Sequence, residues 1–379
     1  MLEKKAMSNE IKIQNRQMIY QYIRSRGVVS KQDIVVDLQL SLPTITQNLE
    51  YLKKKRLIDI SSEKIKNTGG RAATAYAYVP DAKAAIGVYL TAHHINVVAV
   101  DLSGNIIHRS KERVEFDIEN TIYLKYLAAK VEEVKQHANI TDEQLLGVSV
   151  AVPGLLSENY ERVTYGMSLD FTGTTKAQIC KYIPYQTKMC HDSYASGYAE
   201  VWSEDKIQNA FYLSLNNTLG GAIIVERRVY GGDANKGGEI GHMTIFAEGG
   251  KQCYCGKFGC ADTICNAGLL DQYTDGNLEA FFVLVNQGDA TAKQLWEDYL
   301  QNLALIINNL RMLFDNVIIL GGYVGVYIEE HMEQLYQIVD KRNSFGEKAK
   351  DFLMPCHYKG DATSVGAAIL FVDEFILNI

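Results

Sequence analysis

The sequence predicts an α/β protein in which a small, basic, helical head precedes a larger body of two lobes. At 379 residues the chain is too long for one simple core, so two or three folding units are expected. Residues 1–80 carry 14 Lys and Arg against 7 Asp and Glu, whereas the remainder carries 24 against 38. Helical periodicity dominates the first part, and strands alternating with helices follow it. We therefore expect domains at 1–80 and 81–379.

Composition and the absence of targeting signals indicate a cytoplasmic protein that has no membrane partner. No stretch approaches the roughly 18 uninterrupted apolar residues of a membrane span. The charged start, residues 1–14, lacks the apolar run of a signal peptide. Seven cysteines in such a compartment do not indicate a disulfide framework. Four of them are scattered and are expected to be small buried hydrophobic residues: Cys180, Cys190, Cys265 and Cys356.

Three helices are predicted in the head. Apolar residues recur at helical spacing from Ile11 to Ile23. Ser30, followed three residues later by Asp33, is an N-terminal capping signal for a second helix. Pro43 suits an early position of a third helix, where a backbone N–H is not needed.

The third helix has one apolar face and one face suited to DNA. Ile45, Leu49 and Leu52 recur at i, i+4 and i+7, so we expect them to face the core. The other side carries amides that can read adenine edges, and hydroxyls and cations that can hold phosphates. The candidate DNA-binding residues of this helix are Thr44, Gln47, Asn48, Lys53 and Lys54.

Two strands, at 57–60 and 75–79, flank a polar segment and complete a predicted winged helix-turn-helix. Arg71 lies in the Gly-Gly-Arg tip of this wing, where an Arg can enter a narrow A·T minor groove. Helix spacing, wing and basic charge together favour DNA binding. A three-helix bundle that binds another protein is the alternative.

The body shows one order of elements twice. Three strands followed by alternating helix and strand is the order of the ribonuclease-H-like, actin-type ATPase fold. We expect a first lobe at about 81–190, joined by the C-terminal helix, and a second lobe at about 191–360. The predicted elements are strands at 84–90, 95–101, 113–116, 146–151, 210–215, 221–226 and 317–320, and helices at 121–137, 291–314 and 361–377.

The strongest chemical signal is a run of Gly, His and Cys residues at 237–260. One imidazole and three thiols fill the four positions of a structural zinc site. Gly256 and Gly259 allow the sharp turns that bring the thiols together. Chance clustering and a redox pair formed by the first two cysteines are the alternatives. The predicted zinc ligands are His242, Cys253, Cys255 and Cys260.

The Gly-Glu-Ile-Gly-His run at 238–242 and the Cys-x-Cys-Gly-x-x-Gly-Cys run at 253–260 resemble motifs of the ROK family of repressors, open reading frames and sugar kinases. This resemblance covers roughly residues 81–379, and the head resembles the DNA-binding domain of the family's regulator branch. It implies a regulator, of repressor type, of carbohydrate metabolism genes that binds a DNA operator and a sugar or sugar-phosphate effector. Because winged-helix proteins commonly read two half-sites, a homodimer or homotetramer is expected.

The resemblance also implies a sugar pocket. Asp192 matches the residue with which the kinases take a proton from the reacting hydroxyl, although a helix N-cap is the alternative role. Three positions depart from the family's usual Asn, Asn and Glu, so the sugar preference is expected to be altered or sugar binding lost. Those three are Ser168, His191 and Asp262. The full implied set is Pro153, Gly154, Ser168, His191, Asp192, Glu239, His242 and Asp262.

The family's kinases begin the body with an Asp-x-Gly-Gly-Thr-Lys-like loop that wraps phosphates. Residues 88–94 contain no Asp, Gly or Lys, and Tyr89 and Leu90 are expected to fill that space. We therefore predict no catalytic residue and no kinase activity, with Asp192 as a vestigial base. An ATP-dependent sugar kinase with a regulatory head and a ligand-independent DNA-binding protein are the alternatives. Turnover of ATP with an aldose favours the former, and a failure to bind any sugar favours the latter.

Overall fold

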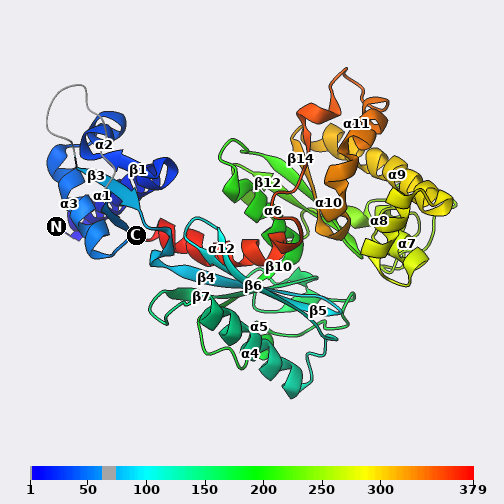
Figure 1. Ribbon diagram of the computed structural model, residues 1–379, viewed down its shortest axis with the longest axis horizontal. Coiled ribbons are helices and arrows are strands. Elements are labelled where there is room, and N and C mark those ends of the chain that lie inside the picture. Colours follow the sequence, from blue (N-terminus) through cyan, green and yellow to red (C-terminus); the bar gives the residue numbers. More distant parts are fainter. Residues whose placement is uncertain (1, 62–73) are drawn as a thin grey trace.

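A computed structural model describes residues 2–61 and 74–379 of the chain (Figure 1). Within these residues a helical head with a small sheet adjoins two lobes, each built on a five-stranded sheet. The C-terminal helix lies between the head and the lobes (Figure 1). The chain thus has the α/β architecture predicted from its sequence, a winged-helix-like head on a two-lobed, actin-type body.

The head begins as the sequence signals predict. Ser30 caps the second helix through a reciprocal capping box with Asp33, and Pro43 lies in the first turn of the third helix. A short strand at residues 28–30, which the sequence analysis did not predict, pairs with the last strand and makes the antiparallel sheet order β1-β3-β2. The elements are α1 Leu2–Arg26, β1 Val28–Ser30, α2 Lys31–Leu38, α3 Leu42–Lys54, β2 Ile58–Ile60 and β3 Ala75–Tyr78.

The first lobe carries the sheet β10-β7-β4-β5-β6, with antiparallel β4–β5–β6 pairs and parallel β4–β7–β10 pairs. Helix α4 packs on this sheet and supplies Leu127 and Val131 to its core. The elements are β4 Ala84–Leu90, β5 His94–Asp101, β6 Ile106–Arg113, α4 Thr121–His137, β7 Leu145–Val152, β8 Leu155–Leu156, β9 Val163–Tyr165, α5 Lys176–Ile179 and β10 Thr187–His191.

The prediction of a third strand at 113–116 is wrong. The strand runs over 106–113 instead and forms the edge of the sheet. Three of its four exposed side chains are charged, Arg109, Lys111 and Arg113, and its half-buried face is mostly polar, so it lacks the apolar alternation by which buried strands are recognised.

The second lobe carries the sheet β13-β12-β11-β14-β15. Its core is filled by the long helix α9, whose buried Trp296 packs against Phe282 and Tyr299. The elements are α6 Asp192–Ser203, β11 Ala210–Leu215, β12 Leu219–Val225, β13 Arg228–Tyr230, α7 Gly268–Asp271, α8 Leu278–Gln287, α9 Ala290–Phe314, β14 Val317–Gly321, α10 Gly322–Ile328, α11 Met332–Asp340 and β15 Leu353–Pro355. The last helix, α12 Ala362–Leu377, returns to the first lobe and packs on β4, β5 and β7.

Helices α6 and α12 form the junction of the three parts. They approach so closely that a Cβ added at Gly366 of α12 would meet the carbonyl oxygen of Ala195 at 1.8 Å. One apolar cluster includes Ile19 and Ile23 of the head, Trp202 of α6 and Ile369 of α12. The head is therefore packed on the junction through apolar contacts as well as joined to it by the chain.

Candidate effector pocket, metal cluster and DNA-binding helix

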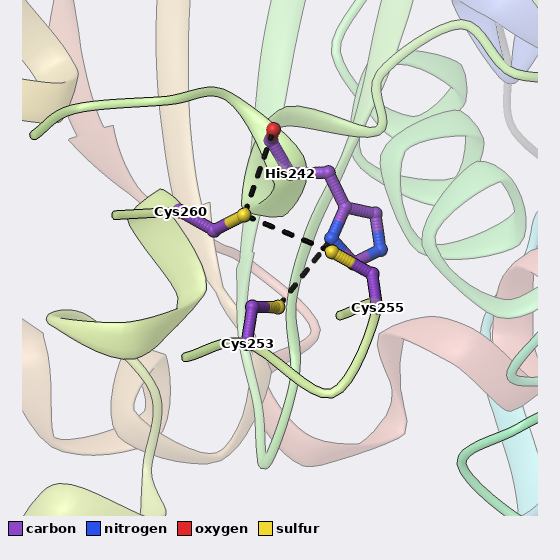
Figure 2. A group of neighbouring side chains, drawn as sticks. All are labelled: His242, Cys253, Cys255 and Cys260. Atoms are coloured by element: carbon purple, nitrogen blue, oxygen red, sulfur yellow. Dashed lines mark hydrogen bonds between the residues drawn. The ribbon is translucent and has the colours of Figure 1, made fainter. Parts of the chain in front are cut away.

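The predicted metal ligands converge in the structure. The ligand atoms of His242, Cys253, Cys255 and Cys260 all lie within 4.8 Å of one another (Figure 2). The Sγ atoms of Cys255 and Cys260 are 3.8 Å apart, and Cys253 Sγ lies 3.7 Å from His242 Nδ1. In a tetrahedral zinc site, Zn–S distances near 2.3 Å place two sulfurs roughly 3.8 Å apart, so this donor set has the spacing of such a site.

The loop that carries the cysteines is shaped by backbone bonds and glycines. Gly256 and Gly259 have φ angles of +88° and +76°, a region that favours glycine. The Gly256 N–H donates to the Cys253 carbonyl at 2.9 Å, which closes the turn. Burial raises the pKa of Cys253 to about 12, so a bound cation is needed to hold this thiol as a thiolate.

His242 lies in the cluster and at the wall of a pocket. Its Nδ1 faces the cysteines, and its Nε2 lies 3.1 Å from the hydroxyl of Tyr254. A metal held by Nδ1 would fix the ring while Nε2 remains directed at this neighbour. Sequence reasoning missed Tyr254, although it is the central residue of the Cys-x-Cys motif.

The pocket beside His242 gathers residues from both lobes. It also contains Asn216 and Tyr165, which sequence reasoning missed. Its volume is only about 50 Å³, which is room for a few waters, so a sugar ring would require it to widen. Seven of the eight residues predicted to bind sugar line it: Pro153, Gly154, Ser168, His191, Asp192, Glu239 and His242.

Asp192 lies at the centre of this arrangement, as the first residue of α6. Its Oδ1 accepts the backbone N–H of Ser193 at 2.6 Å, and its Oδ2 accepts the hydroxyl of Tyr89 at 3.2 Å. Burial and the neighbouring carboxylate raise the pKa of Tyr89, so its phenol stays protonated and donates. The N-cap residue of α6 is His191, and Asp192 is the first residue inside the helix. The alternative role of Asp192 as the N-cap residue therefore does not agree with the structure.

His191 bridges the two acidic residues of the pocket. Its Nδ1 lies 3.4 Å from Asp192 Oδ1, and its Nε2 lies 3.7 Å from Glu239 Oε1. The ring is buried and lies 4.7 Å, centroid to centroid, from the ring of Tyr194.

The structure does not bring Asp262 into the pocket lining. Its buried carboxylate accepts the backbone N–H of Leu219 at 2.6 Å and thereby supports the start of β12. This placement corrects the expectation that Asp262 contacts the sugar directly. Its side chain is shorter than the Glu usual in the family, and its carboxylate is already hydrogen-bonded to the backbone. Ser168 does line the pocket, and its hydroxyl donates to the carbonyl of Pro153 at 3.2 Å.

A wide cleft of about 1,300 Å³ lies between the lobes beside the β4–β5 turn. The turn is closed on itself, since Thr91 N–H donates to the His94 carbonyl at 3.0 Å and His94 N–H donates to Thr91 Oγ1 at 3.0 Å. Leu90 is buried in the core of the first lobe, and Tyr89 points to Asp192. The backbone N–H groups of Thr91 and His94 are therefore not free to bind a phosphate.

In helix α3, Ile45, Leu49 and Leu52 face the core as predicted. Gln47, Lys53 and Lys54 are exposed, and Thr44 is half-buried. Arg71 lies outside the described residues.

Asn48 corrects the expectation of an exposed DNA-reading face. Its side chain is only 6% exposed, and its amide nitrogen donates to the carbonyl of Thr44 at 2.9 Å. Asn48 borders Leu49 on the buried side because the apolar stripe of this helix is wider than the three residues used to predict it.

A search of the described helices for one that is long and apolar enough to cross a membrane finds none.

Fold and site together define a two-lobed body of the sugar-kinase type that carries a winged-helix-like head. The chain belongs to the ROK family, whose model matches residues 85–374. It is 20% identical to a xylose repressor of Caldicellulosiruptor bescii, over 96% of both chains. Its fold matches that of a ROK transcriptional regulator, a homologue of the E. coli MLC protein, with a TM-score of 0.75 at 22% identity over 97% of each chain. A ROK glucokinase from Streptomyces griseus, in complex with glucose and AMPPNP, matches with a TM-score of 0.63 at 19% identity, over 76% of this chain and 98% of that one.

Proposed function

We propose that this protein is a sugar-responsive DNA-binding regulator, of repressor type, for carbohydrate metabolism genes, and that its body has no kinase activity. The xylose repressor and the solved ROK transcriptional regulator, which match nearly the whole chain including the head, support this proposal. The observation that carries it is the union of a helix-turn-helix head with a pocket in which Asp192, Glu239 and His242 converge. Carboxylates and an imidazole are suited to pairing with sugar hydroxyls.

In this proposal the pocket binds a sugar but transfers no phosphate. A kinase needs free backbone N–H groups around the phosphates, whereas those of Thr91 and His94 are used within the turn. Asp192 would then accept a hydrogen bond from a sugar hydroxyl and would not act as a base. Zinc, held by His242 and the three cysteines, would keep the ring of His242 in place beside the sugar.

Helix α6 is the proposed link between sugar and DNA. It begins at Asp192 in the pocket and ends beside the head, where the Arg24 guanidinium lies 4.1 Å from the centroid of the Trp202 ring. The side chain of Gln17 also donates to the carbonyl of Leu377 in α12. Closure of the lobes on a sugar would move these helices and reorient the heads of a dimer or tetramer, with a coupling of about 1–3 kcal/mol.

A thermal melt of the zinc-loaded protein against aldoses, amino sugars, N-acetylated sugars and their 6-phosphates tests the sugar part of the proposal. At about 100 times its dissociation constant a ligand adds about 2.7 kcal/mol of stability, which is a measurable shift. A selective shift supports a sensor. No shift from any sugar favours a ligand-independent DNA-binding protein, an alternative that the narrow pocket and the departures from the family at Ser168 and His191 also support.

Electrophoretic mobility shifts and salt titrations on the protein's own promoter test the DNA part. Lys54→Ala is expected to weaken binding to all sequences alike and to reduce the salt slope by about 1, because it removes one phosphate contact. Gln47→Ala is expected to relax sequence preference by about 1–3 kcal/mol. Asn48→Ala is the control, since its buried amide should affect stability and not base reading.

An assay of ATP consumption with the same sugars separates the regulator from the kinase alternative. We expect turnover no greater than that without protein, with a ROK glucokinase as the positive control. Sugar-dependent release of ADP that is abolished by Asp192→Asn would establish the kinase.

A further inference from the structure

The pocket that contains Asp192, Glu239 and His242, named the effector pocket here, shares His191 with a second cavity. The second cavity has a volume of about 460 Å³ and lies between the edge strand β10, helix α6 and the edge strand β13 of the other lobe. Ligand pockets typically have volumes of about 300–1,000 Å³. The cavity is therefore large enough for a small molecule and opens to solvent without any change in the lobes.

The walls of this cavity are mainly aromatic and aliphatic. Tyr160, Tyr194 and Tyr198 contribute rings, and Val229 and Leu370 contribute aliphatic side chains. Tyr194 is held in place by the hydrogen bond that its hydroxyl donates to the carbonyl of Gly237 at 2.8 Å. Fixed rings beside aliphatic groups favour a flat, apolar ligand that can pack against them.

The charged groups of the cavity are mainly cationic. Lys176 and Lys188 pair with Glu161 and Glu374, each at 2.5 Å. Arg228 is exposed and makes no ion pair with any residue that the structure describes. An unpaired guanidinium beside an apolar cavity is suited to a carboxylate, which it can bind through two parallel hydrogen bonds.

His191 forms part of the wall between this cavity and the effector pocket. It is 8% exposed, and its Nδ1 is buried without a hydrogen-bond partner in the described structure. The nearest Asp192 oxygen lies 3.4 Å away and does not meet hydrogen-bond geometry. Buried polar groups are normally paired, so the unpaired Nδ1 marks the shared wall of the two spaces as a place where a polar partner can bind.

We propose that this cavity is a second ligand site, for a small aromatic carboxylate whose ring packs on the tyrosines and whose anionic group pairs with Arg228. The occupant touches His191, which also borders Asp192 and Glu239, and so reaches the effector pocket. Only this last effect rests on the proposed function. Binding at the cavity itself does not depend on sugar or DNA.

Calorimetric titration of the full chain with 2-naphthoate tests the proposal, with neutral 2-naphthylmethanol as the matched probe. Arg228→Glu and Val229→Trp are each expected to weaken 2-naphthoate by about tenfold or more, by removing the cation and by filling the cavity. Lys206→Glu makes the same charge change at an exposed site outside the cavity and is expected to alter the affinity less than about twofold.

Equal affinities for the acid and the alcohol, or unchanged 2-naphthoate binding in Arg228→Glu, would overturn the carboxylate site. Binding that survives Val229→Trp would place the probe elsewhere on the protein. Because Val229 is half-buried, circular dichroism and a melt establish whether this variant folds. Arg228→Glu changes an exposed side chain and keeps the test decisive if Val229→Trp does not fold. Failure of any sugar to bind in the melt leaves these outcomes unaffected.

Discussion

The region between the lobes has two ends that differ in shape and in chemistry. At the sugar end, beside Asp192 and His242, the space is narrow, about 50 Å³, and polar groups from both lobes converge on it. At the opposite end, which we name the nucleotide end after the kinase loop with which the β4–β5 turn is compared, the space is wide, about 1,300 Å³, but the turn satisfies its own hydrogen bonds. The larger space is therefore the one whose backbone donors in the β4–β5 turn are already hydrogen-bonded.

This difference shows that volume alone does not decide which ligand a cleft can hold. Binding requires donors and acceptors that are fixed in place and not already paired. At the sugar end, Asp192, Glu239 and His242 converge on one small space, and three cysteines lie behind His242. At the nucleotide end, the N–H groups of Thr91 and His94 are already paired within the turn.

The largest effect is expected from Cys255→Ser, which removes one metal ligand behind the sugar end. The protein should lose its bound zinc, and its melting midpoint should fall by at least about 5 °C, because metal binding contributes folding free energy. Metal analysis and calorimetry measure both. Cys180→Ser, a buried cysteine outside the cluster, is the control and should keep the metal. Full zinc content in Cys255→Ser would mean that the cluster is not the metal site.

Asp192→Asn tests the sugar end directly. Once a sugar is found in the melt, its affinity should fall by about 10- to 100-fold, because a hydrogen bond to a charged acceptor contributes roughly 1.5–3 kcal/mol. Asp271→Asn is the matched change at the nucleotide end and should leave sugar affinity within about twofold. Similar losses in both variants, measured by titration calorimetry, would erase the distinction between the two ends.

Arg24→Ala tests whether the sugar end is linked to the head. Loss of the contact with Trp202 should reduce the sugar-induced change in operator affinity by about fivefold, since such contacts contribute about 1 kcal/mol. Arg26→Ala removes a neighbouring cation that pairs with Asp37 at 3.0 Å within the head. Fluorescence anisotropy with and without sugar should show a normal response in this control. An unaltered response in Arg24→Ala would exclude this contact from the link.

The smallest effect is expected from Tyr89→Phe. The hydroxyl makes one hydrogen bond, to Asp192, so stability should fall by no more than about 1.5 kcal/mol. ATP turnover should remain absent, because the variant restores no backbone donor to the turn. The appearance of sugar-dependent ATP consumption in this variant would mean that Tyr89 alone blocks the kinase reaction.

Much of the fold could be predicted from the sequence because its signals are local. Periodicity predicted α4 over 121–137 with the observed bounds and α9 to within one residue. The capping pair Ser30 and Asp33 located the start of α2. The edge strand β6 was not predicted, because its charged outward residues give it the polar composition of a loop. The spacing of His and Cys residues predicted the metal cluster, since all four lie in one short segment.

Tertiary structure alone decided the rest, because packing between distant segments has no local signature. It buried Asn48, which looked exposed on a helical wheel. It directed Asp262 to the backbone of Leu219 and Tyr89 to Asp192, across 43 and 103 positions of the chain. It also opened the cavity beside His191 at a meeting of edge strands from two lobes. The sequence by itself determined the long helices, the buried strands and the four residues of the metal cluster, whereas long-range packing determined the edge strands and which polar groups remain free to bind.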